Sequence, residues 1–105
     1  MRRGEIWWAE LAPPMGRRPV VLLSRDTAYS HRSEITIASV TTRIRNIPVE
    51  VTLGPKEGLP RPCVANLDSI NTIDKRRLRE FVAALNPGTL DELEAAIHYA
   101  LGLQR

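Results

Sequence analysis

Two arginines, Arg17 and Arg18, stand directly before Pro19 and an unbroken apolar run that ends at Leu23. A guanidinium group stays charged at physiological pH, and its planar fork can bind a phosphate through two parallel hydrogen bonds. Pro19 has a fixed φ and no N–H, so it suits the first residue of a strand and favours an extended Arg18. The pair therefore predicts an anion site where a buried strand begins.

Other cations, hydroxyls and amides gather at the ends of further predicted strands. Side chains of these types bind phosphate oxygens and the edges of unstacked nucleobases. Taken one at a time, each is more simply explained as a turn or capping residue. The cations are concentrated after the first and third predicted strands, however, which favours a shared binding role. The candidates are Arg17, Arg18, Arg25, Thr41, Thr42, Arg43, Arg45, Asn66, Asp68, Ser69 and Asn71.

Few residues could support a metal site or a covalent nucleophile. His31 and His98 are isolated, and Cys63, the only cysteine, has no partner at ligand spacing. We therefore expect no structural metal, no cofactor, and a Cys63 that is buried rather than reactive. Glycine-rich phosphate loops and the Gly-x-Ser-x-Gly motif do not occur in the sequence. A single cysteine excludes an internal disulfide and is consistent with a reducing compartment.

The length and composition predict one globular domain spanning residues 1–105. Apolar residues make up 43% of the chain and charged residues 26%, which is ordinary for a soluble protein. The longest apolar run is far shorter than the ~20 residues of a membrane-spanning helix. The segment from Met1 to Glu5 leads into a strand pattern rather than a signal peptide. We expect a cytoplasmic protein that does not bind a membrane.

The positive charge is concentrated in the first half of the chain. The net charge is +3; residues 1–50 contain eight arginines and five acidic residues, whereas residues 51–105 contain seven residues of each sign. Thirteen of the fifteen basic residues are arginine, which fits phosphate recognition but equally fits a GC-rich coding sequence. The positions of the arginines, rather than their number, therefore favour an anionic ligand.

Short apolar or alternating segments bounded by turn residues predict strands. The segment from Pro19 to Ser24 is apolar on both faces, as expected for a strand covered on both sides. Residues 25–34, 41–48 and 54–62 are polar or rich in turn formers and predict loops, and Asp74 can cap a single turn over 75–78. The predicted strands are Glu5–Leu11, Pro19–Ser24, Ile35–Val40, Val49–Leu53, Cys63–Asp68 and Arg79–Leu85.

The C-terminal segment predicts an amphipathic helix. Its apolar residues, from Leu90 to Leu101, recur at intervals of three and four. Asn86 followed by Pro87 gives one start signal, and Thr89 with Glu92 gives a rival capping box. Five or six strands followed by one helix indicate a mainly β, α+β protein, a small antiparallel barrel with a helix packed on it.

Taken in order, these segments resemble MazF/PemK-type toxins, the toxin halves of type II toxin–antitoxin pairs. The resemblance covers nearly the whole chain and implies an SH3-related PemK-like barrel and a homodimer. It further implies a metal-independent, ribosome-independent and sequence-specific endoribonuclease that cleaves single-stranded mRNA. The motifs that carry it are Arg3–Trp8, Arg18–Ser24, Ala38–Thr42, Asn66–Asp68, Thr72–Lys75 and the C-terminal helix.

The family's reaction is attack of a ribose 2′-hydroxyl on the adjacent phosphate, which leaves a 2′,3′-cyclic phosphate and a 5′-hydroxyl. The resemblance implies that Arg18 and Thr41 are catalytic, with Asp68 as a candidate for proton transfer or base recognition. Some family members carry a His before the Arg-Pro pair and an Arg at the position of Asn66; this chain has neither, so a His-based proton transfer is not expected. The expected RNA-binding residues are Arg17, Arg25, Thr42, Arg43, Arg45, Asn66 and Ser69.

The resemblance also implies a cognate antitoxin whose acidic segment would bind the same cations as RNA. Two other functions stay open at this point. One is a gyrase-poisoning toxin of the same fold that acts by protein–protein binding, and the other is a catalytically silent RNA-binding module.

Overall fold

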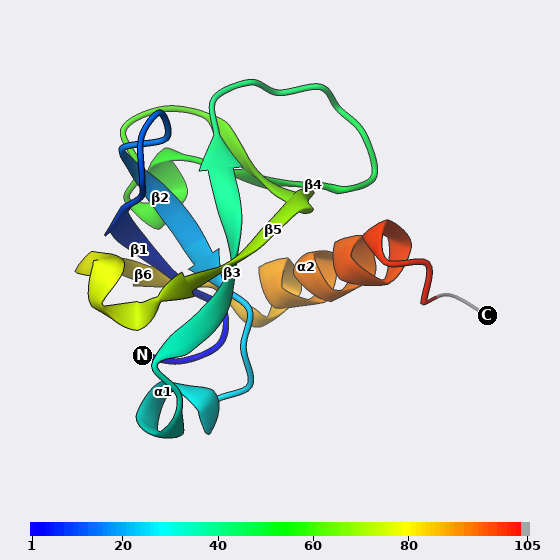
Figure 1. The fold of residues 1–105 in the computed structure, drawn as a ribbon. Coiled ribbons are helices and arrows are strands. Elements are labelled where there is room, and N and C mark those ends of the chain that lie inside the picture. The colour runs from blue at the N-terminus through cyan, green and yellow to red at the C-terminus, as the bar shows by residue number, and fades with distance from the viewer. Residues whose placement is uncertain (104–105) are drawn as a thin grey trace.

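The computed structural model describes residues 1–103 and consists of one curled antiparallel sheet with a helix against it (Figure 1). The strands follow the spatial order β4-β5-β3-β2-β1-β6, so β4 and β6 form the two edges. This arrangement confirms the predicted fold class, a small antiparallel barrel with a C-terminal helix, although the curled sheet is open between its edges. The strands are β1 Glu5–Glu10, β2 Arg17–Leu22, β3 Glu34–Thr41, β4 Glu50–Leu53, β5 Cys63–Asp74 and β6 Leu78–Ala84.

Both faces of the sheet carry a buried apolar cluster, which explains the doubly apolar pattern of β2. Val20 and Leu22 point into one cluster, together with Ile35 and Ile37 of β3. Val21 points into the other cluster, which lies under the C-terminal helix. Successive residues of a strand face opposite sides, so a strand buried on both sides must be apolar throughout.

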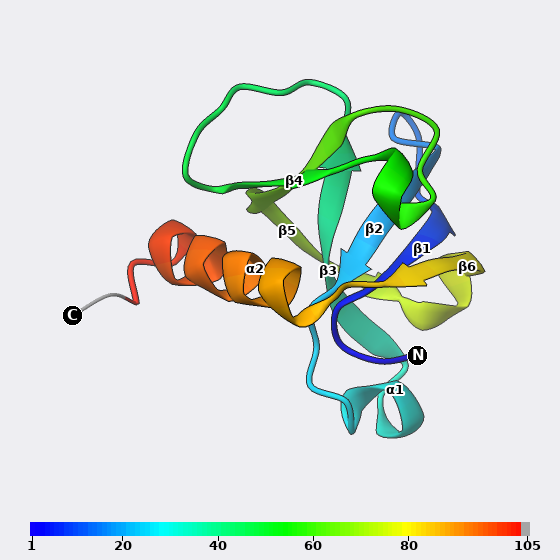
Figure 2. The same cartoon turned by 180° about the vertical axis from the view of Figure 1, so that it is seen from behind.

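The C-terminal helix, α2 (Pro87–Ala100), packs against β4 and β5 (Figure 2). Its buried side chains are Leu93 and Ala96, which enter the cluster under the helix. The Asn86 side chain accepts a hydrogen bond from the Thr89 N–H at 2.8 Å, and Pro87 occupies the first turn. The helix therefore begins at the first of the two predicted start signals.

Three sequence predictions were wrong: two strand boundaries and one loop that contains a helix. β2 begins at Arg17, so both arginines belong to the strand, because Arg17 and Arg18 pair with Glu10 and Ala9 of β1. β5 continues to Asp74 instead of ending at Asp68, because β3 pairs with its polar second half. The predicted loop over 25–34 contains a short helix, α1 (Ala28–His31), whose Tyr29 hydroxyl donates to the Ser24 carbonyl at 3.0 Å.

Two single turns connect the later strands. The first, η1 (Pro55–Glu57), lies in the segment predicted as irregular, and the second, η2 (Lys75–Arg77), matches the predicted turn. Asp74 caps η2 by accepting from the Arg76 N–H at 2.8 Å and also pairs with the Arg76 guanidinium at 2.8 Å. These hydrogen bonds lower the pKa of Asp74 to about 2.

The pairing of β3 with β5 contains an irregularity that shapes one end of the sheet. Ala38 pairs with Ile70 but the next residue, Ser39, pairs with Asn66. Residues 67–69 therefore form a bulge on β5, which bends a strand and changes where its side chains point.

The burial of α2 generates a stability prediction. Leu93 has no exposed surface, so Leu93→Ala should leave a cavity and lower the free energy of unfolding by ~2–5 kcal/mol. The neighbouring exposed Glu92→Ala should change it by less than ~0.5 kcal/mol. Denaturant unfolding of both variants measures the difference, and equal effects would contradict the packing of this helix.

Candidate anion-binding site

A cavity of about 180 Å³ opens at the end of the sheet where β2 begins and β3 ends. Antiparallel pairing of these strands brings Arg18 to the same end as Thr41, although the two residues are distant in the sequence. None of the lining side chains is acidic, and three are arginines. The lining residues are Met15, Arg18, Ser39, Thr41, Arg43, Arg45, Asn66 and Ser69.

The two arginines that begin β2 point to opposite faces of the sheet, because successive strand residues alternate. Arg18 is half-buried and lines the cavity. Arg17 lies on the other face, with its guanidinium 4.9 Å from the centre of the Trp8 ring and 3.2 Å from a Glu80 carboxylate oxygen. One arginine therefore faces the cavity, while the other is held by an aromatic ring and an ion pair.

Acceptor atoms around the cavity are already occupied by backbone N–H groups. Thr41 Oγ1 accepts from the Arg43 N–H at 3.1 Å, and Asn66 Oδ1 accepts from the Asp68 N–H at 2.9 Å. The Thr41 hydroxyl proton and the Asn66 NH₂ group are left to donate. Together with the guanidinium groups, they make a cavity lined by donors, which is the requirement for binding an anion.

Two buried polar atoms at this cavity have no hydrogen-bond partner. Within residues 1–103, the buried side-chain nitrogen and oxygen atoms without a hydrogen-bond partner are Arg18 Nε and Ser39 Oγ. Leaving a buried polar group unpaired costs ~1–3 kcal/mol. Both residues line the same cavity, so a bound ligand with acceptor atoms would remove the cost.

The connection between β3 and β4 carries Arg43 and Arg45, and a carboxylate holds it in place. Glu50 Oε1 accepts from the backbone N–H groups of Arg45 and Asn46 at 3.0 and 2.9 Å. Asn46 has a positive φ of 57°, a conformation that asparagine tolerates better than most residues. This carboxylate fixes the loop that presents the two cations.

Six of the ten residues expected to be catalytic or to bind RNA line this cavity. Four do not. Arg17 faces the other side, and Thr42 lines a separate, mostly apolar pocket beside Trp8. Arg25 lies beyond the far end of β2, which ends at Leu22, whereas Arg18 lies at its beginning. Asp68 is exposed on the β5 bulge, next to Ser69 but outside the lining.

Two lining residues, Ser39 and Met15, were not among the sequence candidates. Ser39 is the buried hydroxyl of an otherwise apolar stretch and lies two residues before Thr41. A period of two along the predicted strand could have placed it on the same face as Thr41. Met15 lies in the loop before β2, where no sequence signal predicts its orientation.

The described residues offer little other chemistry. Cys63 is buried, and desolvation raises the pKa of its thiol, so it stays protonated and unreactive at neutral pH. Within residues 1–103 no group of three or more His, Cys, Asp and Glu side chains is positioned to hold a metal ion. No helix in this range is long and apolar enough to cross a membrane.

The fold is a small curled antiparallel sheet, and the donor-lined cavity at its strand ends has the composition that an anionic ligand requires. The family model of PemK-like, MazF-like toxins of type II toxin–antitoxin systems matches residues 2–101. The chain belongs to this family.

Relatives with known names and structures support the assignment. A probable endoribonuclease of Mycobacterium tuberculosis, MazF5, is 46% identical over 72 residues, covering 68% of this chain and 65% of that protein. The toxin MazF-mt6 of the same species superposes with a TM-score of 0.88 at 30% identity, covering 96% of this chain and 99% of that one. A mycobacterial endoribonuclease in complex with its cognate antitoxin superposes with a TM-score of 0.87 at 28% identity, covering 100% of this chain and 98% of that one.

Proposed function

We propose that this protein is the toxin of a type II toxin–antitoxin pair and cleaves single-stranded mRNA in the cytoplasm, independently of metal ions and ribosomes, at specific sequences. The observation that carries the proposal is the donor-lined cavity. It combines unpaired Arg18 Nε and Ser39 Oγ atoms with the free Thr41 hydroxyl proton. A phosphodiester supplies the acceptor oxygens that these groups need.

The proposed reaction is attack of the ribose 2′-oxygen on the adjacent phosphorus. The bond from phosphorus to the 5′-oxygen breaks, which leaves a 2′,3′-cyclic phosphate and a 5′-hydroxyl. RNA provides the nucleophile, so the protein must align it and stabilise the added negative charge on the phosphorane. Arg18 binds the equatorial oxygens, and Thr41 donates to the phosphate or orients the attacking hydroxyl.

Proton transfer has to use groups other than histidine, since neither histidine lines the cavity. A guanidinium is a poor acid because it keeps its proton at any physiological pH. Arg18 therefore acts chiefly through its charge; the 2′-hydroxyl loses its proton to solvent, and the 5′-oxygen takes a proton from solvent. Asp68 precedes the lining residue Ser69 in the sequence but does not itself line the cavity, so any contact that it makes with a proton or a base comes from outside the lining.

Substitution of Arg18 tests the site. Arg18→Ala should slow RNA cleavage by ~10²-fold or more, as expected when an electrostatic donor to the transition state is removed. Arg17→Ala is the matched control, because the neighbouring arginine points to the other face, and it should change the rate by less than ~10-fold. Cleavage of a mixed-sequence RNA in EDTA, followed on a gel, gives both rates.

The same assay separates the alternatives. Absence of wild-type cleavage at every sequence would exclude the nuclease and favour the gyrase-poisoning or silent binding function. If the wild type cleaves RNA and the Arg18→Ala variant cleaves it at the same rate, the catalytic site lies elsewhere on the protein.

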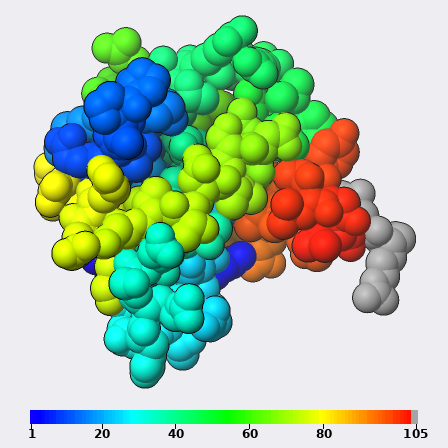
Figure 3. Space-filling model, in the orientation of Figure 1, coloured from blue at the N-terminus to red at the C-terminus, as the bar shows by residue number. Residues whose placement is uncertain are grey.

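We further propose a homodimer. Large apolar side chains are exposed on the connection between β3 and β4 and at the C-terminal end of α2, and these segments lie on one face of the molecule (Figure 3). Ile44 is 42% exposed, Tyr99 53% and Leu101 58%. Exposed apolar groups that cluster in this way are typical of protein–protein interfaces. A symmetric dimer would bury the same face of both copies.

Charge placed in this face should separate the copies. Leu101→Asp should shift the protein from dimer to monomer in sedimentation velocity at micromolar concentration. Phe81→Asp, on the opposite edge of the sheet and 49% exposed, is the control and should stay dimeric, with folding of both checked by circular dichroism. A monomeric wild type, or dissociation only in the control, would contradict the proposed interface.

The partner that neutralises the toxin is proposed to be an antitoxin with an acidic, initially disordered segment. Arg18, Arg43 and Arg45 line a cavity without acidic residues, and such a site attracts carboxylates as well as phosphates. Affinity for the co-expressed antitoxin should fall as salt is raised from ~0.05 to ~0.5 M, since salt screens exposed charges. Calorimetric titration measures this, and an unchanged affinity would indicate an apolar interface instead.

A further inference from the structure

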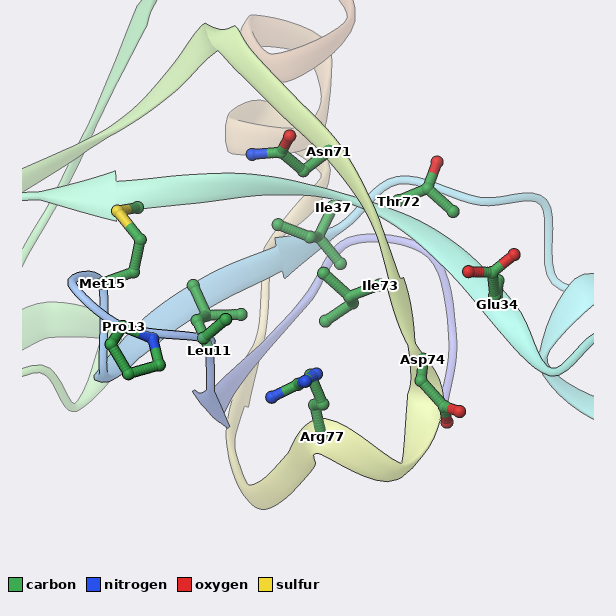
Figure 4. A pocket seen from close by; sticks show the side chains of 11 residues that line it. Leu11, Pro13, Met15, Glu34, Ile37, Asn71, Thr72, Ile73, Asp74 and Arg77 are labelled. Atoms are coloured by element: carbon green, nitrogen blue, oxygen red, sulfur yellow. The ribbon is translucent and has the colours of Figure 1, made fainter.

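A second and larger pocket, of about 530 Å³, lies beside the candidate site and is shown in Figure 4. We call it the flanking pocket. It lies between the loop before β2, the second half of β5 and the turn η2, and its volume is within the ~300–1,000 Å³ range of ligand pockets. Its lining residues are Leu11, Ala12, Pro13, Met15, Glu34, Ile37, Asn71, Thr72, Ile73, Asp74 and Arg77.

The flanking pocket continues the candidate site along one face of the sheet. Met15 lines both cavities and therefore stands at their border. Along β3, Ile37 belongs to the flanking pocket, while Ser39 and Thr41 belong to the candidate site. These alternate residues share a face at intervals of ~7 Å. A chain bound at the candidate site can therefore extend into the flanking pocket without crossing the sheet.

The floor of the flanking pocket is apolar and its rim is polar. Leu11, Ile37 and Ile73 form the floor, and Asn71 and Arg77 lie on opposite sides of it (Figure 4). Asn71 is exposed and has no side-chain hydrogen bond within residues 1–103. Arg77 Nη1 donates to the Glu10 carbonyl at 3.0 Å, which fixes the guanidinium at the rim. An apolar surface with an amide at its edge suits a flat base.

The charges favour a base over a phosphate in the flanking pocket. Glu34 and Asp74 line it, whereas the candidate site has no acidic residue. Asp74 is paired with Arg76 and its pKa is lowered to about 2, so it is ionised at neutral pH. Carboxylates repel a phosphate, but they accept hydrogen bonds from amino groups of bases. The phosphate therefore belongs in the arginine-lined cavity and a base in the flanking pocket.

We propose that the flanking pocket binds one unstacked base of single-stranded RNA next to the cleaved phosphate, and that Asn71 reads the edge of this base. The proposal rests on the proposed RNA cleavage. It assigns Asn71 to sequence preference rather than to chemistry, because Asn71 lies outside the candidate site. An amide carries a donor beside an acceptor and can select a base that presents the complementary pair.

The experiment is to cleave a randomised RNA pool with the wild type, Asn71→Ala and Asn71→Asp, and to sequence the new 5′ ends. Asn71→Ala should relax the preference at one position beside the cut by ~5- to 150-fold, the discrimination given by one base-edge contact. Asn71→Asp keeps the shape but replaces the donor, so it should change which base is preferred there. Thr52→Ala, an exposed strand residue of β4 outside both cavities, should leave every preference unchanged.

A second measurement separates recognition from a structural effect. On an RNA shortened to lack the affected nucleotide, the wild type and Asn71→Ala should cleave at equal rates. An unchanged preference in both Asn71 variants, or a uniform loss of rate on all sequences, would overturn the proposal while leaving RNA cleavage intact. Absence of cleavage by the wild type would overturn both.

Discussion

The site depends on the antiparallel register in which β2 pairs with β3. Val20 pairs with Ser39 and Leu22 with Ile37, and continuing this register sets Arg18 opposite Thr41. A slip of one residue would turn every side chain of a strand to the other face. Such a slip would take Val20 and Leu22 out of the cluster that they fill, turn them toward the helix side of the sheet, and turn Arg18 away from the cavity. The apolar clusters on both faces therefore fix the register, and the register assembles the site.

The cavity becomes a donor site through local hydrogen bonds that involve no ligand. The backbone N–H groups of Arg43 and Asp68 occupy the acceptor atoms of Thr41 and Asn66, and the Glu50 carboxylate likewise accepts from the N–H groups of the loop. Each of these contacts is a turn-type hydrogen bond between near neighbours in the chain. These residues can therefore be turn formers and binding residues at the same time, because the turn hydrogen bonds determine which of their atoms remain to bind a ligand.

The arrangement lowers stability at the place where it provides binding. The unpaired Arg18 Nε and Ser39 Oγ each carry a desolvation cost of ~1–3 kcal/mol, and three arginines repel one another around one cavity. The clusters under α2 and beneath β2 and β3 offset this cost, since their largest side chains are fully buried. An anion that pairs with these groups stabilises the folded protein by the same contacts.

The sequence by itself determined the succession of strands along the chain, the doubly covered β2 and an amphipathic C-terminal helix with two rival start signals. It also predicted Arg18 and Thr41 as site residues. These features depend on local patterns: apolar periodicity, a capping side chain and cations before a proline. Tertiary pairing decided the rest. It extended β5 through a polar segment to Asp74, because β3 supplied hydrogen bonds that the segment could not provide alone. It also held Arg17 against Trp8 and Glu80 and left Arg18 facing the cavity, since the surroundings of a side chain depend on register and face rather than on residue type.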